Sequence, residues 1–167
     1  LEPAKQRIHS AMKDNQGNIW LGAYRKGLIM LPVKRNHFRY IGSKAQVSDL
    51  IGSGCVTSLL IDNNNLLWVG TDNDGIYIVT PDKIRLAHIS VENGAPFKIM
   101  GLVQGPDGRI WFGSSNEGLW SANAGSYTLT KHPHPNLGMS VQSIAIDNRG
   151  LVWMATLGDG IQCYNGI

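Results

Sequence analysis

Residues 62–75 read DNNNLLWVGTDNDG, and the chain carries this pattern four times. In each copy a turn precedes a tryptophan, and a pair of small residues begins two positions after that tryptophan. A glycine ends the copy. The tryptophans follow one another at intervals of 48, 43 and 42 residues. A period of that length with strand-like content indicates a modular array of repeated units. The other copies span residues 14–27, 106–118 and 147–160.

The second copy and its flanks predict a four-stranded antiparallel unit. Short β-branched and aromatic runs separated by Asp, Asn and Gly are typical of hairpins. No segment of ten or more residues has a 3.6-residue apolar period, so we expect almost no helix. The expected strands of this unit are Val56–Ile61, Leu66–Thr71, Gly75–Val79 and Arg85–Val91.

The residues that recur in the turn have structural explanations. A glycine or asparagine stands at one fixed turn position, as expected where the backbone needs a positive φ. An aspartate three residues earlier can accept backbone N–H bonds and close the turn. The third copy replaces that aspartate by Gly105-Pro106. The fixed turn positions are Gly17, Asn65, Gly108 and Gly150, and the aspartates are Asp14, Asp62 and Asp147.

The tryptophans and the small residues that follow them are interpreted as framework. Large aromatic side chains stabilise the packing between neighbouring sheets. A residue without a side chain two positions later leaves room for close sheet packing. The framework residues are Trp20, Trp68, Trp111 and Trp153, with Gly22, Gly70, Gly113 and, in the last copy, Ala155.

The repeat favours an all-β fold of the β-propeller type. A four-stranded sheet with two apolar faces is not stable alone, and stacking such sheets around an axis buries both faces. Four blades are recognisable, at about residues 8–41, 56–91, 99–131 and 141–167. Two arrangements stay open: Leu1–Arg7 supplies the outer strand of the last blade and closes a four-bladed ring, or the blades form an incomplete arc.

The pattern resembles the two-component-regulator propeller repeat. Three copies match it, at Ile8–Gly27, Val56–Gly75 and Val141–Gly160, and the copy at Ile99–Gly118 has Gly101 where the family has serine. The resemblance implies the extracytoplasmic, periplasmic sensor region of a bacterial hybrid two-component histidine kinase/response regulator. It also implies a seven-bladed type of propeller, and hence an incomplete arc that associates with another copy or with the rest of a parent propeller.

Composition excludes several other classes of protein. The formal net charge is +3 and the basic residues are scattered, whereas a nucleic-acid surface has a concentrated basic stripe. Cys55 and Cys163 have no partner at metal-ligand spacing, so neither a metal nor a cofactor is expected. No apolar run reaches the ~20 residues of a membrane span. The chain opens on Leu1-Glu2-Pro3 without an initiator methionine, which indicates a piece of something longer.

Catalytic constellations are scarce in this sequence. His132 and His134 flank Pro133 in an expected loop between repeats, where they can bind a metal, act as acid and base, or belong to a solvated connector. Propeller lyases that this architecture resembles use histidines at the central mouth, so a lyase is one alternative function. We expect no enzyme activity from this segment, and His132 and His134 remain candidate ligand-binding residues.

We expect ligand recognition by loop residues that differ from one repeat to the next. Loops between the second and third strands of the blades differ between copies on a constant framework, as in a site grafted on a scaffold. Their side chains suit an oligosaccharide or another small ligand, although each can also be an ordinary loop residue. A dimerisation platform is the second alternative. The candidate residues are Tyr24, Arg25, Asn73, Asp74, Asn116, Glu117 and Asp159.

Overall fold

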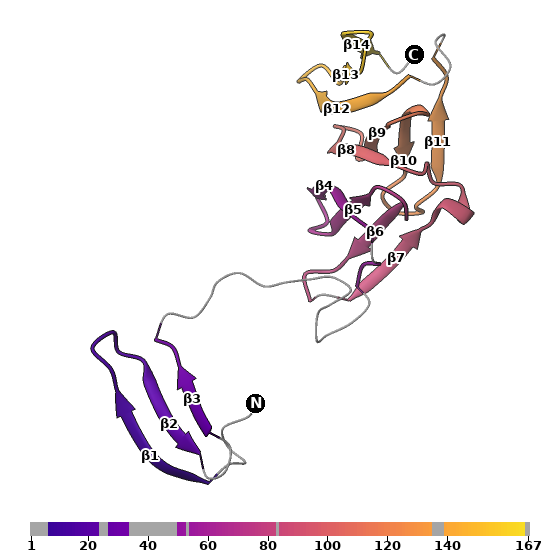
Figure 1. The fold of residues 1–167 in the computed structure, drawn as a ribbon. Coiled ribbons are helices and arrows are strands. Elements are labelled where there is room, and N and C mark those ends of the chain that lie inside the picture. The colour runs from indigo at the N-terminus through magenta and orange to yellow at the C-terminus, as the bar shows by residue number, and fades with distance from the viewer. Residues whose placement is uncertain are drawn as a thin grey trace. The chain divides into compact units, whose positions relative to one another are not determined.

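The chain forms an all-β structure in a computed structural model that describes residues 7–23, 27–33, 50–52, 54–82, 84–134 and 139–165. It divides into two compact units, residues 1–40 and 41–167. Among the described residues, fourteen strands form four antiparallel sheets, whose strands are labelled in Figure 1. The only helical element among the described residues is a 3₁₀ turn, Val91–Asn93. The prediction of an all-β propeller fold with almost no helix is confirmed.

The first unit contains one three-stranded sheet. Its strands β1 (Ile8–Lys13), β2 (Ile19–Ala23) and β3 (Gly27–Leu31) pair in sequence order. Hairpin pairing of consecutive strands is what the short turns between them dictate. The expected fourth strand of this blade, which would end near residue 41, lies outside the described residues.

The second unit contains three sheets, each built from consecutive strands. The first strands of these sheets, β4, β8 and β12, lie side by side, and the sheets follow one another as blades (Figure 1). The strands are β4 (Val56–Ile61), β5 (Leu67–Thr71), β6 (Ile76–Val79) and β7 (Arg85–Ile89); β8 (Ile99–Gln104), β9 (Ile110–Ser114), β10 (Gly118–Ala122) and β11 (Leu129–His132); and β12 (Val141–Ile146), β13 (Val152–Thr156) and β14 (Ile161–Tyr164).

The predicted strands of the second blade agree with the structure to within one residue except at the end of the fourth strand. Strand β7 was expected to reach Val91 but ends at Ile89. The side chain of Ser90 accepts a hydrogen bond from the N–H of Asn93 and caps a 3₁₀ turn there. Gly94 ends that turn with a φ of 90°, a conformation that glycine adopts without strain. The local capping sequence therefore overrides the strand pattern.

In the first, second and fourth copies a single aspartate holds the tryptophan hairpin together. Its Oδ1 accepts N–H bonds from the turn: for Asp62, from Asn64 at 2.9 Å and from Leu66 at 2.8 Å. Its Oδ2 accepts the indole N–H of the tryptophan six residues later, at 3.0 Å for Trp68. The sequence predicted the turn bonds but not the bond to the indole. The other pairs are Asp14–Trp20 at 2.9 Å and Asp147–Trp153 at 3.2 Å.

The third copy makes the same turn without the aspartate. Gly105 donates its N–H to the carbonyl of Arg109 and accepts from the N–H of Gly108, as the aspartates do in the other turns. A Cβ atom at Gly105 would lie 3.0 Å from Nε1 of Trp111. The indole and the carboxylate of Asp107 therefore occupy the space beside Gly105. The backbone bonds preserve the turn, together with a bond from the N–H of Arg109 to Oδ1 of Asp107 at 3.1 Å.

The core of the second unit lies between its sheets. Trp68 is completely buried against Ile99, at the start of the next sheet, and Phe112 belongs to the same cluster. Glycines allow the sheets to approach: a Cβ atom on Gly70 would lie 2.7 Å from Cγ2 of Ile99, and one on Gly113 would lie 2.6 Å from Cβ of Val141. Real Cβ atoms do not approach other carbon atoms that closely, so both positions require glycine.

We predict that Gly113→Ala lowers the free energy of unfolding by about 1–3 kcal/mol, because overpacking forces the next sheet away. Urea denaturation followed by circular dichroism measures this change. Gly125→Ala is the control: an added Cβ atom there meets nothing closer than 3.5 Å. Equal stability of Gly113→Ala and the wild-type protein would contradict the packing argument.

We predict that Asp62→Ala destabilises the protein by about 3 kcal/mol, because it removes three hydrogen bonds and leaves a buried indole N–H without an acceptor. Asp82→Ala, at an exposed turn position, serves as the matched control. Both variants are compared by thermal and urea unfolding. A loss no larger than that of the control would show that the carboxylate is dispensable.

Candidate functional site

Three acidic residues occupy one repeat position at the same end of consecutive sheets. Asp74, Glu117 and Asp159 each stand immediately before a glycine at the start of the third strand, which is either its first residue or the residue before it. These glycines have φ values of 73°, 76° and 68°, so the backbone has the same left-handed conformation after each acid. The sequence pattern selected all three acids from their loops.

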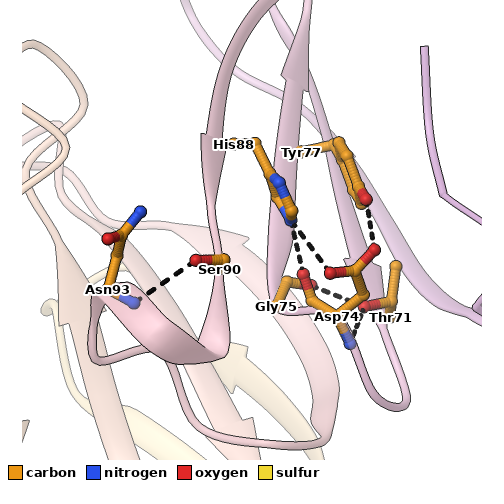
Figure 2. A network of polar contacts seen from close by, with 7 residues as sticks. All are labelled: Thr71, Asp74, Gly75, Tyr77, His88, Ser90 and Asn93. Carbon is orange, nitrogen blue, oxygen red and sulfur yellow. Dashed lines mark hydrogen bonds and ion pairs between the residues drawn. The ribbon is translucent and has the colours of Figure 1, made fainter. Parts of the chain in front are cut away.

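Asp74 is the centre of a polar network (Figure 2). The hydroxyl of Tyr77 donates to its carboxylate. Nε2 of His88 lies 2.7 Å from the carbonyl oxygen of Asp74 and 3.3 Å from its Oδ1. Thr71 Oγ1 accepts the N–H of Asp74 at 3.0 Å and donates to the carbonyl of Gly75 at 2.9 Å. The carboxylate is therefore held from the third and fourth strands of its blade, and Thr71 of the second strand fixes the backbone that carries it.

The aromatic partners of this network are stacked and covered. The rings of Tyr77 and His88 lie 3.9 Å apart and are nearly parallel. Burial, followed by the hydrogen bond and the charge of Asp74, raises the pKa of Tyr77 to about 12. A Cβ atom at Gly52 would lie 2.6 Å from the Tyr77 hydroxyl, so this glycine lets the backbone close over the network. Tyr77 therefore remains a proton donor at neutral pH.

The third blade contains a corresponding cluster built from different residue types. Lys131 Nζ lies 3.6 Å from Glu117 Oε2 and 5.2 Å from the centre of the Trp120 ring. The cross-strand register pairs Trp120 with Lys131 as it pairs Tyr77 with His88. An acid, an aromatic residue and a base thus meet in two consecutive blades.

Sequence reasoning missed the aromatic and basic members of these clusters. A usable signal is present: the aromatic residue follows the acid by 3 residues and the base follows it by 14, in both blades. That spacing acquires meaning only once the register of the third and fourth strands is known. In the fourth blade Gln162 has the aromatic position, and its Nε2 donates to the carbonyl of Asp159 at 3.1 Å.

The other candidate loop residues lie apart from these clusters. Asn73 and Asn116 are exposed at the turns, and Asn116 donates its backbone N–H to Ser114 Oγ at 3.4 Å. Asp159 is exposed as well. Tyr24 and Arg25 lie outside the described residues. The structure therefore brings Asp74 and Glu117 into networks and leaves the neighbouring amides at the surface.

His132 is not in a connecting loop, as the sequence suggested, but is the last residue of β11 and is buried. Its Nε2 lies 2.9 Å from Ser121 Oγ and its Nδ1 lies 3.1 Å from the hydroxyl of Tyr164 in the next sheet. Its ring also lies 4.6 Å from that of Trp111. Alternation along the strand turned the residue inward. Both ring nitrogens are therefore within hydrogen-bond distance of a hydroxyl, one in the same blade and one in the next. His134 follows the strand and is half-buried.

The protonation of His132 is coupled to folding. Burial, together with the positive charge of Arg109, lowers the pKa of His132 below its ordinary value of 6.5. The unfolded chain therefore binds a proton that the folded chain resists. The stability contributed by neutral His132 is complete above pH 6.5 and is lost as the pH falls below it.

We predict that His132→Gln weakens the pH dependence of unfolding, because glutamine gains no charge. Urea midpoints between about pH 5 and 7.5 measure the effect, in a window where the carboxylates are ionised. In Asp14, hydrogen bonds led by the Trp20 indole lower the pKa to about 2, well below this window. An unchanged slope in the variant would show that His132 is not the titrating group.

The chemistry available here is hydrogen bonding by fixed groups. Among the described residues no cluster of three or more His, Cys, Asp or Glu side chains is arranged to hold a metal ion. Cys55 and Cys163 are both exposed, free thiols. No helix in the described part of the chain is long and apolar enough to cross a membrane. At this end of the sheets, called the loop end below, the carboxylates of Asp74 and Glu117 are hydrogen-bond acceptors whose positions are set by neighbouring strands.

Comparison with known proteins identifies the repeat. The two-component regulator propeller model matches residues 3–25 and 50–73. Two segments of the chain are thus similar to this repeat, and the resemblance seen in the sequence is confirmed. No curated protein matches the chain.

Several solved structures share the propeller fold. Two are extracellular domains of proteins described as hybrid two-component systems of B. thetaiotaomicron: one has 24% identity and a TM-score of 0.62 over 98% of this chain, the other 19% and 0.53 over 96%. This chain spans 22% of each of them. A virginiamycin B lyase of Staphylococcus aureus has 14% identity and a TM-score of 0.54, covering 99% of this chain and 57% of the lyase.

Proposed function

We propose that the chain is a non-catalytic, ligand-sensing propeller segment of a bacterial two-component signalling receptor. The match of the two-component regulator propeller model to two of the four repeats carries this proposal. The similar extracellular domains support an extracytoplasmic, periplasmic location. In the parent protein, a shift in domain geometry on ligand binding would pass to a histidine kinase domain.

We further propose an oligosaccharide as the ligand. Sugar hydroxyls need acceptors that are already in place, because each ordered side chain otherwise costs about 0.5–1.5 kcal/mol of binding free energy. Asp74 is held by Tyr77 and His88, and Glu117 lies within ion-pair distance of Lys131. Such acceptors at the loop end suit hydroxyl donors, while the exposed amides of Asn73 and Asn116 offer additional donors.

We predict that neutral oligosaccharides bind the intact receptor ectodomain and that combining Asp74→Asn with Glu117→Gln weakens binding at least about tenfold, since a tenfold change corresponds to 1.4 kcal/mol. Isothermal titration calorimetry against a panel of plant and host glycans measures this. Asp82→Asn is the control, at an exposed turn outside these networks. The absence of heat with every glycan would refute the sensing proposal for this ligand class.

A dimerisation platform is the second candidate function. The first sheet leaves apolar side chains uncovered within its own unit, including Met12 at 63% and Leu28 at 66% exposure. These residues line a hollow of about 260 Å³ beside Trp20. Light scattering of the wild-type chain and of Met12→Ser with Leu28→Ser tests this function. A monomer at all concentrations would exclude it.

A further inference from the structure

We propose that a groove between the second and third blades binds a neutral, hydroxyl-rich ligand of the carbohydrate class. This inference rests on the proposed sensing function and assigns it a site that adjoins the acidic loop end at His88 but does not include the acidic side chains. The groove has a volume of about 550 Å³ and lies between β7 with its following 3₁₀ turn and the third and fourth strands of the next blade. That volume falls within the ~300–1,000 Å³ of small-molecule pockets.

Two aromatic side chains supply apolar surface to the groove. Trp120 and Tyr127 both line it. Tyr127 has a φ of 59°, a conformation that is unusual for a bulky residue, in a turn where its N–H donates to the carbonyl of Asn123. Its ring makes an edge contact with Trp68 at 5.8 Å. Residues held in sparsely populated backbone conformations cluster at ligand sites. An aromatic pair of this kind gives the flat contact surface that the apolar face of a sugar ring requires.

Polar groups complement the aromatic pair. The amide of Asn93 points away from Ser90, to which its backbone is bonded (Figure 2). Thr128 also lines the groove. Nε1 of Trp120 is shielded from solvent and has no hydrogen-bond partner among the described residues. A buried donor without an acceptor costs about 1–3 kcal/mol, so a small rotation of the indole toward a ligand oxygen would relieve that cost.

The charges around the groove favour a neutral ligand. Of the described residues that line the groove, His88 alone can carry a positive charge, and Oδ1 of Asp74 lies 3.3 Å from its Nε2. Lys131, beside Trp120, has Glu117 at 3.6 Å. Each nearby cation thus has its own carboxylate, and an anionic ligand would find no uncompensated charge. Because His88 also contacts Asp74, the groove and the loop end share one side chain.

The test is a titration of the isotopically labelled chain with cellobiose, maltose, xylobiose and, as the charged comparison, digalacturonate. The indole N–H signals of the five tryptophans are followed by NMR, and Trp120→Phe assigns the relevant signal. We expect a neutral disaccharide to shift the Trp120 signal saturably. Asn93→Ala should weaken the affinity about tenfold, equivalent to 1.4 kcal/mol. Asn148→Ala, at an exposed turn of the fourth copy, should leave it unchanged.

Each other outcome contradicts the proposal that this groove is the binding site. Absence of a saturable shift at Trp120, or equally strong binding of digalacturonate, contradicts the proposed ligand class at this position. Disaccharide binding that survives Asn93→Ala but is lost in Asp74→Asn with Glu117→Gln places the ligand at the loop end and leaves the sensing function intact. If the intact ectodomain binds none of these saccharides, the sensing function itself is refuted.

Discussion

The hydrogen bonds of one aspartate carboxylate are the constraint on which the blades depend. Asp62 joins the turn that precedes a strand to the indole that the same strand buries, so local chain reversal and sheet packing are set by one side chain. The indole then packs against the next sheet, which a glycine two residues later allows to approach. Turn, strand and blade spacing are therefore specified together within nine residues, and repetition of those residues produces the array.

The junction between the third and fourth blades meets the same requirement differently. Where Gly105 removes the carboxylate, the indole of Trp111 packs beside the rings of His132 and Tyr164. The hydrogen bond from the turn is replaced by contacts that cross to the next sheet, including the bond between His132 and Tyr164. A framework position can thus lose its most characteristic residue and retain the fold, provided that another interaction holds the tryptophan.

Much of the fold followed from the sequence because its determinants are local. Turn position, strand alternation and the period of the tryptophans require no knowledge of distant contacts, and the strands of the second blade were predicted almost residue by residue. The candidate site was harder, because Tyr77 and His88 reach Asp74 only through the pairing of two outer strands. His132 was assigned to a loop because it is followed by a proline, a residue typical of loops, although it is the last residue of a strand. Side-chain networks depend on register, which composition does not reveal.

The fourth copy differs from the others at a position that governs spacing. It has Ala155 where the second and third copies have glycine, on the face that also carries Trp153, which is 38% exposed. In the second and third blades the glycine at this position lets the first side chain of the next sheet, Ile99 or Val141, pack directly against the strand. A methyl group at this position holds any docking sheet further away and widens the gap above the tryptophan. The fourth blade therefore accepts a surface on this face that is less closely fitted than the sheets beside Gly70 and Gly113.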